Sequence, residues 1–183
     1  MGSKKKIMES VELIDGVEVS QDGKTVVFKG KKGESRELIN DPVLKVEIAD
    51  KKITLTSSSQ SRNEKRKIKT HKAHLLNKIH GVSEGYIYKL KICSGHFPMN
   101  VGVANDKFTI KNFLGEKVPR ELKIKEGVTV KVEGEIVTVE SVDKDRAGQV
   151  AADIEQLCRV TNRDLRVFQD GIYLIEKAGA IIK

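Results

Sequence analysis

An internal repeat constrains the fold of this chain more than any other feature. When the sequence is moved by 84 positions without a gap, its first half falls on its second half. The matched residues are Val17 and Val101, Val19 and Val103, Asp22 and Asp106, Thr25 and Thr109, Ser57 and Ser141, Arg36-Glu37-Leu38 and Arg120-Glu121-Leu122, and Ile53-Thr54-Leu55 and Val137-Thr138-Val139. A register kept over this length indicates two copies of one supersecondary unit. We therefore expect the 183 residues to form two domains, 1–82 and 83–183.

In each copy, several short strands precede one helix. The first copy alternates apolar and polar residues around turn signals at Asp22-Gly23, Gly30–Gly33 and Asp50–Lys52. Residues 100–141 alternate in the same way, and 85–99 is expected to form one long strand that joins the copies. Strands followed by a helix, twice, predict an α+β fold: a tandem duplication of a unit of short antiparallel strands packed on one helix.

The helix of each copy shows an amphipathic pattern. A capping box, Ser61 with Glu64, is expected to start the first helix, and Gly81 to end it. Its apolar face is expected to contain Ile68, Leu75, Leu76 and Ile79, with the basic residues Arg66, Lys67, Lys69 and Lys78 off that face. The second helix, from about Asp143, is expected to bury Ala147, Val150, Ala151, Ile154 and Cys158.

The net charge of +8 is placed unevenly along the chain. Residues 1–82 hold 18 Lys and Arg against 11 Asp and Glu, whereas residues 83–183 hold 16 against 15. The segment from Arg62 to Lys78 alone carries seven basic residues and one acid. A basic chain suits a polyanionic partner, because neutralising phosphates releases counterions and gives strong, salt-dependent binding.

Composition argues against membrane and secreted proteins. No apolar run approaches the roughly 20 residues of a membrane helix. The start, MGSKKKIMES, lacks the apolar stretch of a secretory signal, so we expect a cytosolic protein without a membrane partner. Cys93 and Cys158 have no partner at metal-ligand spacing and are expected to be reduced thiols.

No motif for catalysis, a metal or a cofactor is present in the sequence. Gly23-Lys24-Thr25 resembles the end of a phosphate-binding loop, but Glu18 stands where that motif needs a glycine, and the segment is a hairpin tip. Nucleophile-elbow, zinc-protease and dinucleotide-binding motifs are absent. We therefore expect a protein that is not an enzyme and needs no cofactor.

Three basic clusters fit RNA binding. The helix from Arg62 to Lys78 is either a phosphate-binding face of unpaired cations or a solvated surface. Lys144 and Arg146 lie in the first turn of the second helix, where backbone N–H groups favour an anion and where cations oppose the helix dipole. The small residues after them would let an RNA backbone approach, although from the residues alone we favour a plain core helix with a poor start.

The third cluster is the segment from Arg159 to Lys177. Arg159, Arg163 and Arg166 are spaced to reach successive phosphates from an irregular strand, and Asp170-Gly171 is expected to form a turn. Phe168 and Tyr173 either pack in the core, which we favour, or stack on a base. The part after Arg163 has no counterpart in the first copy.

The same segment resembles a known family. The spacing of Gln156, Val160, Arg163, Arg166, Phe168, Asp170-Gly171-Ile172-Tyr173-Leu174 and Lys177 is similar to the C-terminal signature of the ribosomal protein L6 family of the large subunit, in its archaeal and eukaryotic branch. VDKDRAGQVAADIE, GYIYKLKICSGHFPMNV and FTIKNFLGEK also resemble that family. The chain departs from the family at Asp15, where a proline usually precedes the first glycine-valine pair.

The resemblance implies a structural constituent of the large ribosomal subunit. Such a protein binds large-subunit rRNA near the sarcin-ricin region and the stalk base, beside neighbouring ribosomal proteins and close to where translational GTPases dock. In this family the C-terminal copy and its extension are the main RNA-binding part. The RNA-binding residues implied are Lys144, Arg146, Arg159, Arg163, Arg166, Tyr173, Lys177 and His96, and Arg62, Arg66, Lys67 and Lys69 form a secondary RNA-binding set.

Two other classes of function remain open at this point. One is a free-standing RNA-binding regulator, which would be found on small RNAs rather than on ribosomal subunits. The other is an enzyme acting on phosphorylated substrates, which the absence of a clustered nucleophile, base or metal set disfavours.

Overall fold

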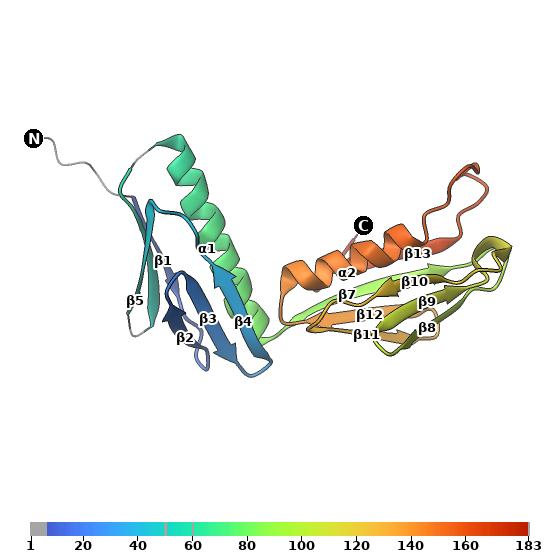
Figure 1. Cartoon of the computed structure of the whole chain (residues 1–183), viewed down its shortest axis with the longest axis horizontal. Helices are drawn as coiled ribbons and strands as arrows, with labels where there is room; N and C mark the ends of the chain where they lie inside the picture. The colour runs from blue at the N-terminus through green and yellow to red at the C-terminus, as the bar shows by residue number, and fades with distance from the viewer. Residues whose placement is uncertain (1–6, 50, 60, 183) are drawn as a thin grey trace, which may run out of the picture. The chain divides into compact units, whose positions relative to one another are not determined.

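The structure, a computed structural model, describes residues 7–49, 51–59 and 61–182. The chain divides into two compact units, Met1–Gly85 and Tyr86–Lys183, each with antiparallel sheets and one long helix (Figure 1). Among the sequence features discussed above, the start MGSKKK and Asp50 in the third turn lie outside the described residues.

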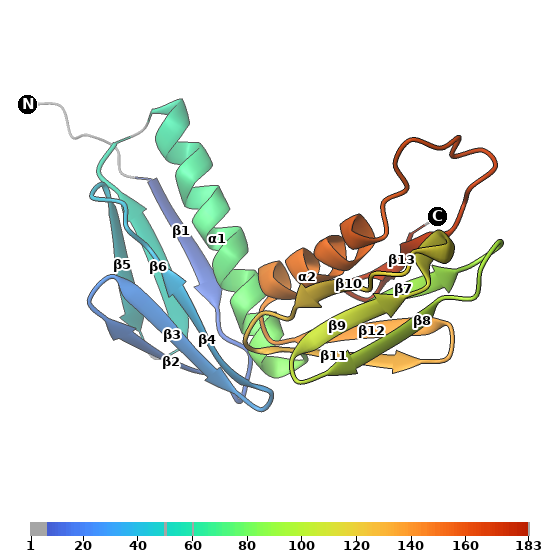
Figure 2. The same cartoon turned by 45° about the vertical axis from the view of Figure 1, so that its right-hand side comes forward.

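Unit 1 contains two three-stranded antiparallel sheets and the helix α1 (Arg62–Ser83). The first sheet has the order β1 (Ile7–Glu12), β6 (Lys52–Ser57), β5 (Leu44–Ala49). The second has the order β2 (Glu18–Asp22), β3 (Thr25–Gly30), β4 (Gly33–Leu38). The helix contacts β1 and β6 of the first sheet and β3 and β4 of the second, so it closes the core of the unit (Figure 2).

Unit 2 repeats this arrangement and extends it. A sheet of β8 (Asn100–Ala104), β9 (Lys107–Lys111) and β10 (Arg120–Lys123) corresponds to β2–β4. The larger sheet has the order β11 (Val128–Glu133), β12 (Ile136–Ser141), β7 (Tyr86–Cys93), β13 (Gly171–Lys177), β14 (Ala180–Ile181), and a short 3₁₀ turn spans Phe113–Gly115. The helix α2 (Lys144–Leu157) contacts both sheets.

Strand β7 takes the place in unit 2 that β1 takes in unit 1. It pairs with β12 as β1 pairs with β6, so the strand expected to join the copies belongs to the second copy. Strands β13 and β14 continue the sheet beyond β7 and have no equivalent among the described residues of unit 1. The predicted α+β duplication is therefore confirmed at the level of topology.

The 84-residue register holds in only part of each unit. In the hairpin β5–β6, Leu44 pairs with Ser57, and in β11–β12 the matching residues Val128 and Ser141 pair likewise. In the first hairpin the turn of unit 2 comes two residues early, since Asp22 pairs with Thr25 but Ala104 pairs with Lys107. In this hairpin the ungapped alignment therefore matches Asp22, a strand residue of unit 1, with Asp106, a turn residue of unit 2.

The matched Arg-Glu-Leu triplets do not occupy equivalent positions. Leu38 at the end of β4 is 61% exposed, whereas Leu122 in β10 packs against the core of unit 2. A strand that shifts by one residue turns every side chain to the other face of its sheet. The two triplets are therefore identical in sequence but occupy different positions in their sheets, although the two units share one topology.

The start of α1 agrees with the sequence prediction, and its end does not. The Ser61 side chain accepts a hydrogen bond of 3.2 Å from the Glu64 backbone N–H, as an N-cap residue does. The helix continues through Gly81 to Ser83, and Gly85, at φ +81°, is the left-handed residue that follows it. The Gly85 N–H donates to the Gly81 carbonyl at 3.0 Å.

The buried face of α1 is rotated from the expected one. Ile68, Leu75 and Ile79 are buried as predicted, but Leu76 is 36% exposed. Lys78, expected off the apolar face, is 5% exposed. The helix packs against two sheets, so its buried face includes positions beyond one apolar stripe. Lys78 is one of these positions, and its ammonium lies 3.8 Å from the Glu37 carboxylate of β4.

The buried face of α2 matches the prediction. Its buried residues are Ala147, Val150, Ala151 and Ile154, and Cys158 just after the helix is also buried. They pack with Tyr88, Leu90, Phe108, Ile110 and Val139 in one core. Burial raises the pKa of the Cys158 thiol to about 12, and both cysteines are free.

Candidate nucleic-acid interface

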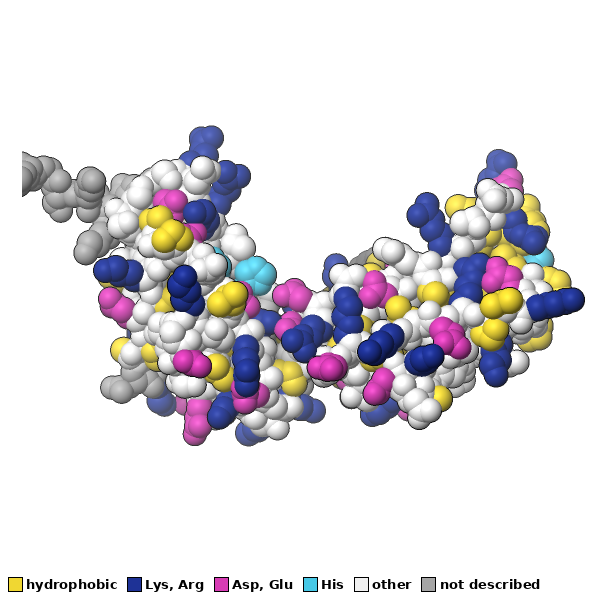
Figure 3. All heavy atoms as spheres, viewed as in Figure 1, with side chains coloured by type: hydrophobic (Ala, Val, Ile, Leu, Met, Phe, Trp, Pro, Cys, Tyr) yellow, Lys and Arg dark blue, Asp and Glu magenta, His cyan; other side chains and the backbone are white. Residues whose placement is uncertain are grey.

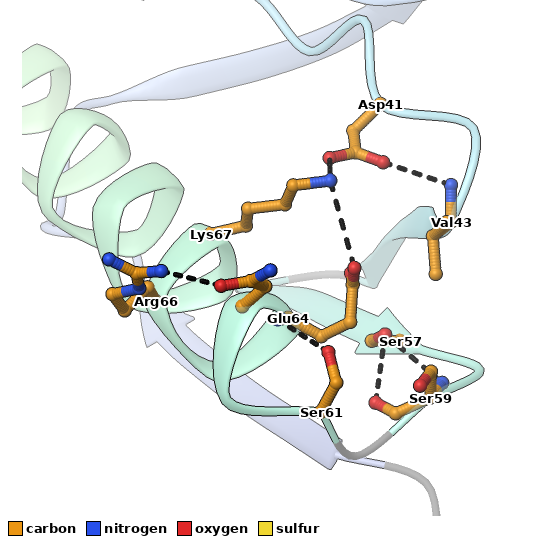
Figure 4. Close-up of polar contacts among 9 residues, drawn as sticks. Asp41, Val43, Ser57, Ser59, Ser61, Glu64, Arg66 and Lys67 are labelled. Carbon is orange, nitrogen blue, oxygen red and sulfur yellow. Dashed lines mark hydrogen bonds and ion pairs between the residues drawn. The ribbon is translucent and has the colours of Figure 1, made fainter.

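Several cations of α1 are paired, contrary to the expectation of an unpaired basic face. The Lys67 ammonium lies 2.8 Å from the Asp41 carboxylate and 3.7 Å from that of Glu64 (Figure 4). The hydrogen bond from Lys67 lowers the pKa of Asp41, and the backbone N–H of Val43 adds to the effect. The pair with Asp41 joins positions far apart in the chain, so the sequence pattern could not show it, whereas Glu64 lies on the same helix three residues before Lys67.

Part of the secondary RNA-binding set remains at the surface of unit 1. Lys72, near the apolar face, lies 2.7 Å from the Glu9 carboxylate of β1. Arg62, Arg66 and Lys69 are exposed, and Arg66 donates a hydrogen bond to the Asn63 side chain. The basic surface that α1 presents is therefore smaller than the count of its cations suggests.

The start of α2 is well capped, so the expectation of a poor start is wrong. Asp143 accepts a hydrogen bond of 3.0 Å from the Asp145 backbone N–H, and its extended backbone is that of an N-cap residue. Asp143 and Asp145 also offset the two cations of this turn. Lys144 lies above the Tyr86 ring at 5.7 Å, and Arg146 donates to the Glu126 carbonyl at 3.1 Å with its side chain 58% exposed.

The small residues of α2 serve packing rather than close approach of RNA. Ala147 and Ala151 are buried in the core. A Cβ added to Gly148 would lie 3.2 Å from the Tyr88 hydroxyl, so the glycine makes room for that ring. The interpretation of these residues as an RNA approach surface is therefore wrong.

The arginines of the third cluster lie on a loop, residues 158–170, between α2 and β13. The loop stands away from the body of unit 2 in both ribbon views (Figures 1 and 2). Arg159, Arg163 and Arg166 are exposed along it. Its turn is at 165–167, after Asp164, rather than at Asp170-Gly171 as expected.

The loop turn is fixed by an arginine and an aspartate. Arg166 donates from its backbone N–H and its guanidinium to Asp164, at 2.9 and 2.8 Å. The hydrogen bond from the Arg166 side chain lowers the pKa of Asp164. The Arg166 side chain is 90% exposed, so it remains accessible to a polyanion despite this pair.

The base of the loop is organised by Asp170, which is 2% exposed. Its carboxylate accepts hydrogen bonds from the backbone N–H of Gly95 at 2.7 Å and of His96 at 3.0 Å, and from His96 Nδ1. Burial alone would raise the pKa of Asp170, but these hydrogen bonds hold it below its usual value. Asp170 thus ties the loop to the segment that follows β7.

Two cationic or titratable side chains of the site meet on the Phe168 ring. The His96 ring stacks on it at 4.7 Å, with 24° between the planes. The Arg163 guanidinium carbon also lies 4.7 Å from its centroid. Since His96 Nδ1 contacts Asp170, the other ring nitrogen, Nε2, is the one available to a partner.

Sequence reasoning missed Arg120, which positions the start of the loop. Its guanidinium donates to the carbonyls of Leu157 at 2.6 Å and Arg159 at 3.3 Å. It also forms two hydrogen bonds with Glu116, at 2.6 and 2.8 Å, and lies 4.3 Å from the Phe113 ring centroid. The hydrogen bond from Arg120 lowers the pKa of Glu116. Arg120 is the first residue of the repeated Arg-Glu-Leu triplet, and no local sequence pattern marks its role.

Tyr173 is more exposed than the core position that we favoured from the sequence. The residue is 42% exposed, and its hydroxyl donates to the Gln169 carbonyl at 3.2 Å. Phe168 is half-buried within the loop. Lys177 is exposed at the other end of β13.

The structure divides the candidate residues of unit 2 into two groups. His96, Arg159, Arg163, Arg166 and Tyr173 lie at the end of the unit where the loop leaves α2. Lys144 and Arg146 lie at the opposite end of α2, a helix of 14 residues and so about 21 Å long. Lys177 is separated from Tyr173 along β13 and joins neither group.

The loop end of unit 2 is apolar as well as basic. Leu165 and Val167 of the loop are 63% and 60% exposed, and Phe97 of the neighbouring segment is 47% exposed. Figure 3 shows Lys and Arg side chains beside apolar ones at this end of the unit. Exposed apolar groups that lie together are common at interaction sites, which makes this end of unit 2 a candidate contact surface.

Two classes of site find no support in the described residues. Within 7–49, 51–59 and 61–182, no helix is long and apolar enough to span a membrane. In the same part of the chain, no group of three or more His, Cys, Asp or Glu is placed to hold a metal ion.

Comparison with known proteins gives consistent matches. A family model described as Ribosomal protein L6 matches residues 15–85 and 97–171, one segment in each unit. A protein of Methanococcus vannielii named large ribosomal subunit protein uL6 is 45% identical over 177 residues, which is 96% of this chain and 97% of the relative. Both the duplication and the loop with its three arginines fall within the matched sequence.

Proposed function

Since the chain belongs to the ribosomal protein L6 family, we propose that the loop end of unit 2 holds it on large-subunit rRNA near the sarcin-ricin region and the stalk base. The protein is a structural constituent of the large ribosomal subunit and is not an enzyme. We further propose which region of the rRNA the protein contacts and which of its residues make the contact. In this position the protein supports the rRNA on which translational GTPases dock, beside neighbouring proteins of the stalk base in the cytosol.

One observation carries the proposal: five candidate residues lie together at the loop end of unit 2, and three of them are arginines on a loop that is fixed at both ends. Arg120 holds its start through the carbonyls of Leu157 and Arg159, and Asp170 holds its base. A loop fixed in this way presents its arginines without a large loss of conformational entropy on binding. Phosphate contacts from such arginines set the position of a protein on RNA.

The other basic residues have secondary roles in this proposal. Lys144 and Arg146 contact the rRNA at the start of α2, and Lys177 contacts it at the far end of β13. Arg62, Arg66 and Lys69 of unit 1 make a weaker contact, because Lys67 and Lys72 are already engaged by carboxylates. The net charge of +1 in residues 83–183 does not oppose this, since acids on other faces leave local phosphate contacts intact.

The test is a footprint of the full chain on deproteinised large-subunit rRNA. The wild-type protein is expected to protect nucleotides of the sarcin-ricin region. A variant with Arg159→Ala, Arg163→Ala and Arg166→Ala is expected to lose most of this protection and to have a salt slope lower by about three, one for each phosphate contact. The control variant removes three exposed lysines elsewhere, Lys45, Lys111 and Lys123, and therefore the same charge.

Two results would contradict the proposal. One is a footprint in another region of the rRNA. The other is an equal loss of affinity in the arginine variant and in the lysine control, because binding would then depend on net charge rather than on the loop.

A further inference from the structure

An apolar groove lies where the end of α2, the loop and the start of β13 meet. Its apolar lining comes from Cys158, Val160, Leu165, Phe168, Ile172 and Tyr173. The hollow has a volume of about 320 Å³, at the lower end of the range found for small-ligand sites. The groove is thus large enough for one flat ring system and too small for an element of secondary structure.

One wall of the groove is a fixed aromatic ring. The Tyr173 hydroxyl donates to the Gln169 carbonyl at 3.2 Å, which sets the plane of the ring. Its other neighbour is Gly171, where an added Cβ would lie 3.0 Å from the ring. The glycine therefore lets the ring occupy this place, and the ring separates the groove from a second hollow lined by Cys93 and His96.

The rim of the groove is basic and also offers polar atoms. Arg159 lines it, and Arg163 lies over the Phe168 ring that forms part of the lining. Gln156 supplies an amide at the edge. The one acid of the groove, Glu155, accepts a hydrogen bond from the Leu174 backbone N–H at 3.4 Å, so its charge is partly compensated.

We propose that this groove receives a single unpaired rRNA base, turned out of its helix and stacked on the Tyr173 ring. The inference rests on the function proposed above. A flat apolar slot with arginines at its mouth matches a nucleotide, whose base is planar and whose phosphates are anionic. An apolar side chain of a neighbouring protein would fill the slot but would leave the arginines of its rim without partners.

The base contact and the phosphate contacts of the loop differ in their chemistry. Stacking involves no charge, so it contributes affinity without releasing counterions. Removing the Tyr173 ring should therefore weaken binding while the salt dependence stays the same. Removing Arg163 should lower the salt slope by about one.

The experiment measures binding of the full chain to deproteinised large-subunit rRNA over a range of salt. Tyr173→Leu removes the ring and keeps an apolar side chain at a position that is 42% exposed. The matched control, Tyr173→Phe, keeps the ring and loses only the hydrogen bond to Gln169. The leucine variant is expected to bind about 5- to 150-fold more weakly at every salt concentration, and the phenylalanine variant, which keeps the stacking ring but not the hydrogen bond that sets its plane, to lose less affinity than the leucine variant.

Chemical probing of base edges in the same complexes gives a second readout. One unpaired base within the footprint should be protected by wild type and by Tyr173→Phe, and should become reactive with Tyr173→Leu, while nearby backbone protection persists.

Equal affinity and equal protection for all three proteins would overturn the base pocket and leave the proposed function standing. A lower salt slope in Tyr173→Leu would also overturn it, since the lost contact would then be to phosphate. If the wild-type protein leaves no footprint on this rRNA, the proposed function and the inference fail together.

Discussion

At the scale of single residues, one buried acid and one exposed acid decide how the basic face is presented. Asp170 takes three hydrogen bonds from Gly95 and His96, and Glu116 takes two from Arg120. Neither acid faces an RNA in the proposal. Each instead fixes a segment that carries or supports the arginines, so the geometry of a cationic surface depends on carboxylates behind it.

Replacing Asp170 with asparagine should destabilise unit 2 at neutral pH. The amide places an NH₂ group where donors from Gly95 and His96 point, and a broken buried hydrogen bond costs about 1–3 kcal/mol. The pKa of Asp170 is lowered by folding, so its contribution is complete above the unfolded carboxyl pKa of about 3.9 and is lost as the pH falls through the folded value.

Urea unfolding of wild type and Asp170→Asn at pH 7 and pH 3 measures the contribution of the Asp170 carboxylate to stability. The difference in the free energy of unfolding should be large at pH 7 and should shrink at pH 3. Asp164→Asn is the control, because that carboxylate is exposed in the loop turn and its loss should change stability little. A deficit of the same size at both pH values would contradict the assignment.

At the scale of elements, each helix is held against two sheets, and the closest approaches involve glycine. In β3, a Cβ added to Gly30 would lie 2.5 Å from the Val82 carbonyl oxygen of α1, which is backbone and cannot move aside. The Lys32 N–H also donates to this carbonyl at 3.0 Å. The hairpin β3–β4 and the end of α1 are therefore in direct backbone contact.

Gly30→Ala should lower the free energy of unfolding of unit 1 by about 1–3 kcal/mol, the range observed when a tightly packed site is overfilled. The matched control is Gly102→Ala in β8, where an added Cβ meets nothing within 4 Å. Thermal unfolding of both variants measures the effect. Similar melting temperatures for the two variants would contradict the contact described here.

At the scale of the whole molecule, two units of one topology carry unequal shares of RNA binding in the proposal. Unit 1 holds the larger charge excess, yet Lys67 and Lys72 of α1 are engaged by acids of the same unit. Unit 2 has a near-neutral balance and a loop with three exposed arginines. Net charge by domain is therefore a poor guide to where the RNA lies.

The salt dependence of binding to large-subunit rRNA should show this inequality. Replacing Arg62, Arg66 and Lys69 with alanine should lower the salt slope by less than one, whereas each loop arginine should account for about one. Both sets remove three charges, so composition is matched. Equal slopes for the two triple variants would place unit 1 on the RNA as firmly as unit 2.

The structural features that depend on residues close together in the chain were predictable from the sequence. The N-cap at Ser61, the buried face of α2 and the hairpin at Asp22-Gly23 follow from local patterns, and all three are confirmed. Leu76 and Lys78 were assigned to the wrong sides of α1 because the helix packs against two sheets, and the helix sequence alone does not show where those sheets lie.

The candidate site was predicted less completely than the fold. The three loop arginines are exposed as expected, but the residues that hold the loop were not identified. Arg120 acts through the carbonyls of Leu157 and Arg159, and Asp170 through Gly95 and His96, at separations of 37 to 75 residues along the chain. Contacts of that range leave no periodic trace in a sequence.

The two helices end in different surroundings, and this has a consequence for how a duplicated scaffold gains a new part. The last turn of α1 leads through Glu84 and Gly85 directly into β7, so any insertion there would separate one copy from the next. The last turn of α2 does not connect two copies, and residues 158–170 form a loop between it and β13. Duplication thus leaves one of two equivalent helix ends free to vary, and in this chain that end carries the arginines.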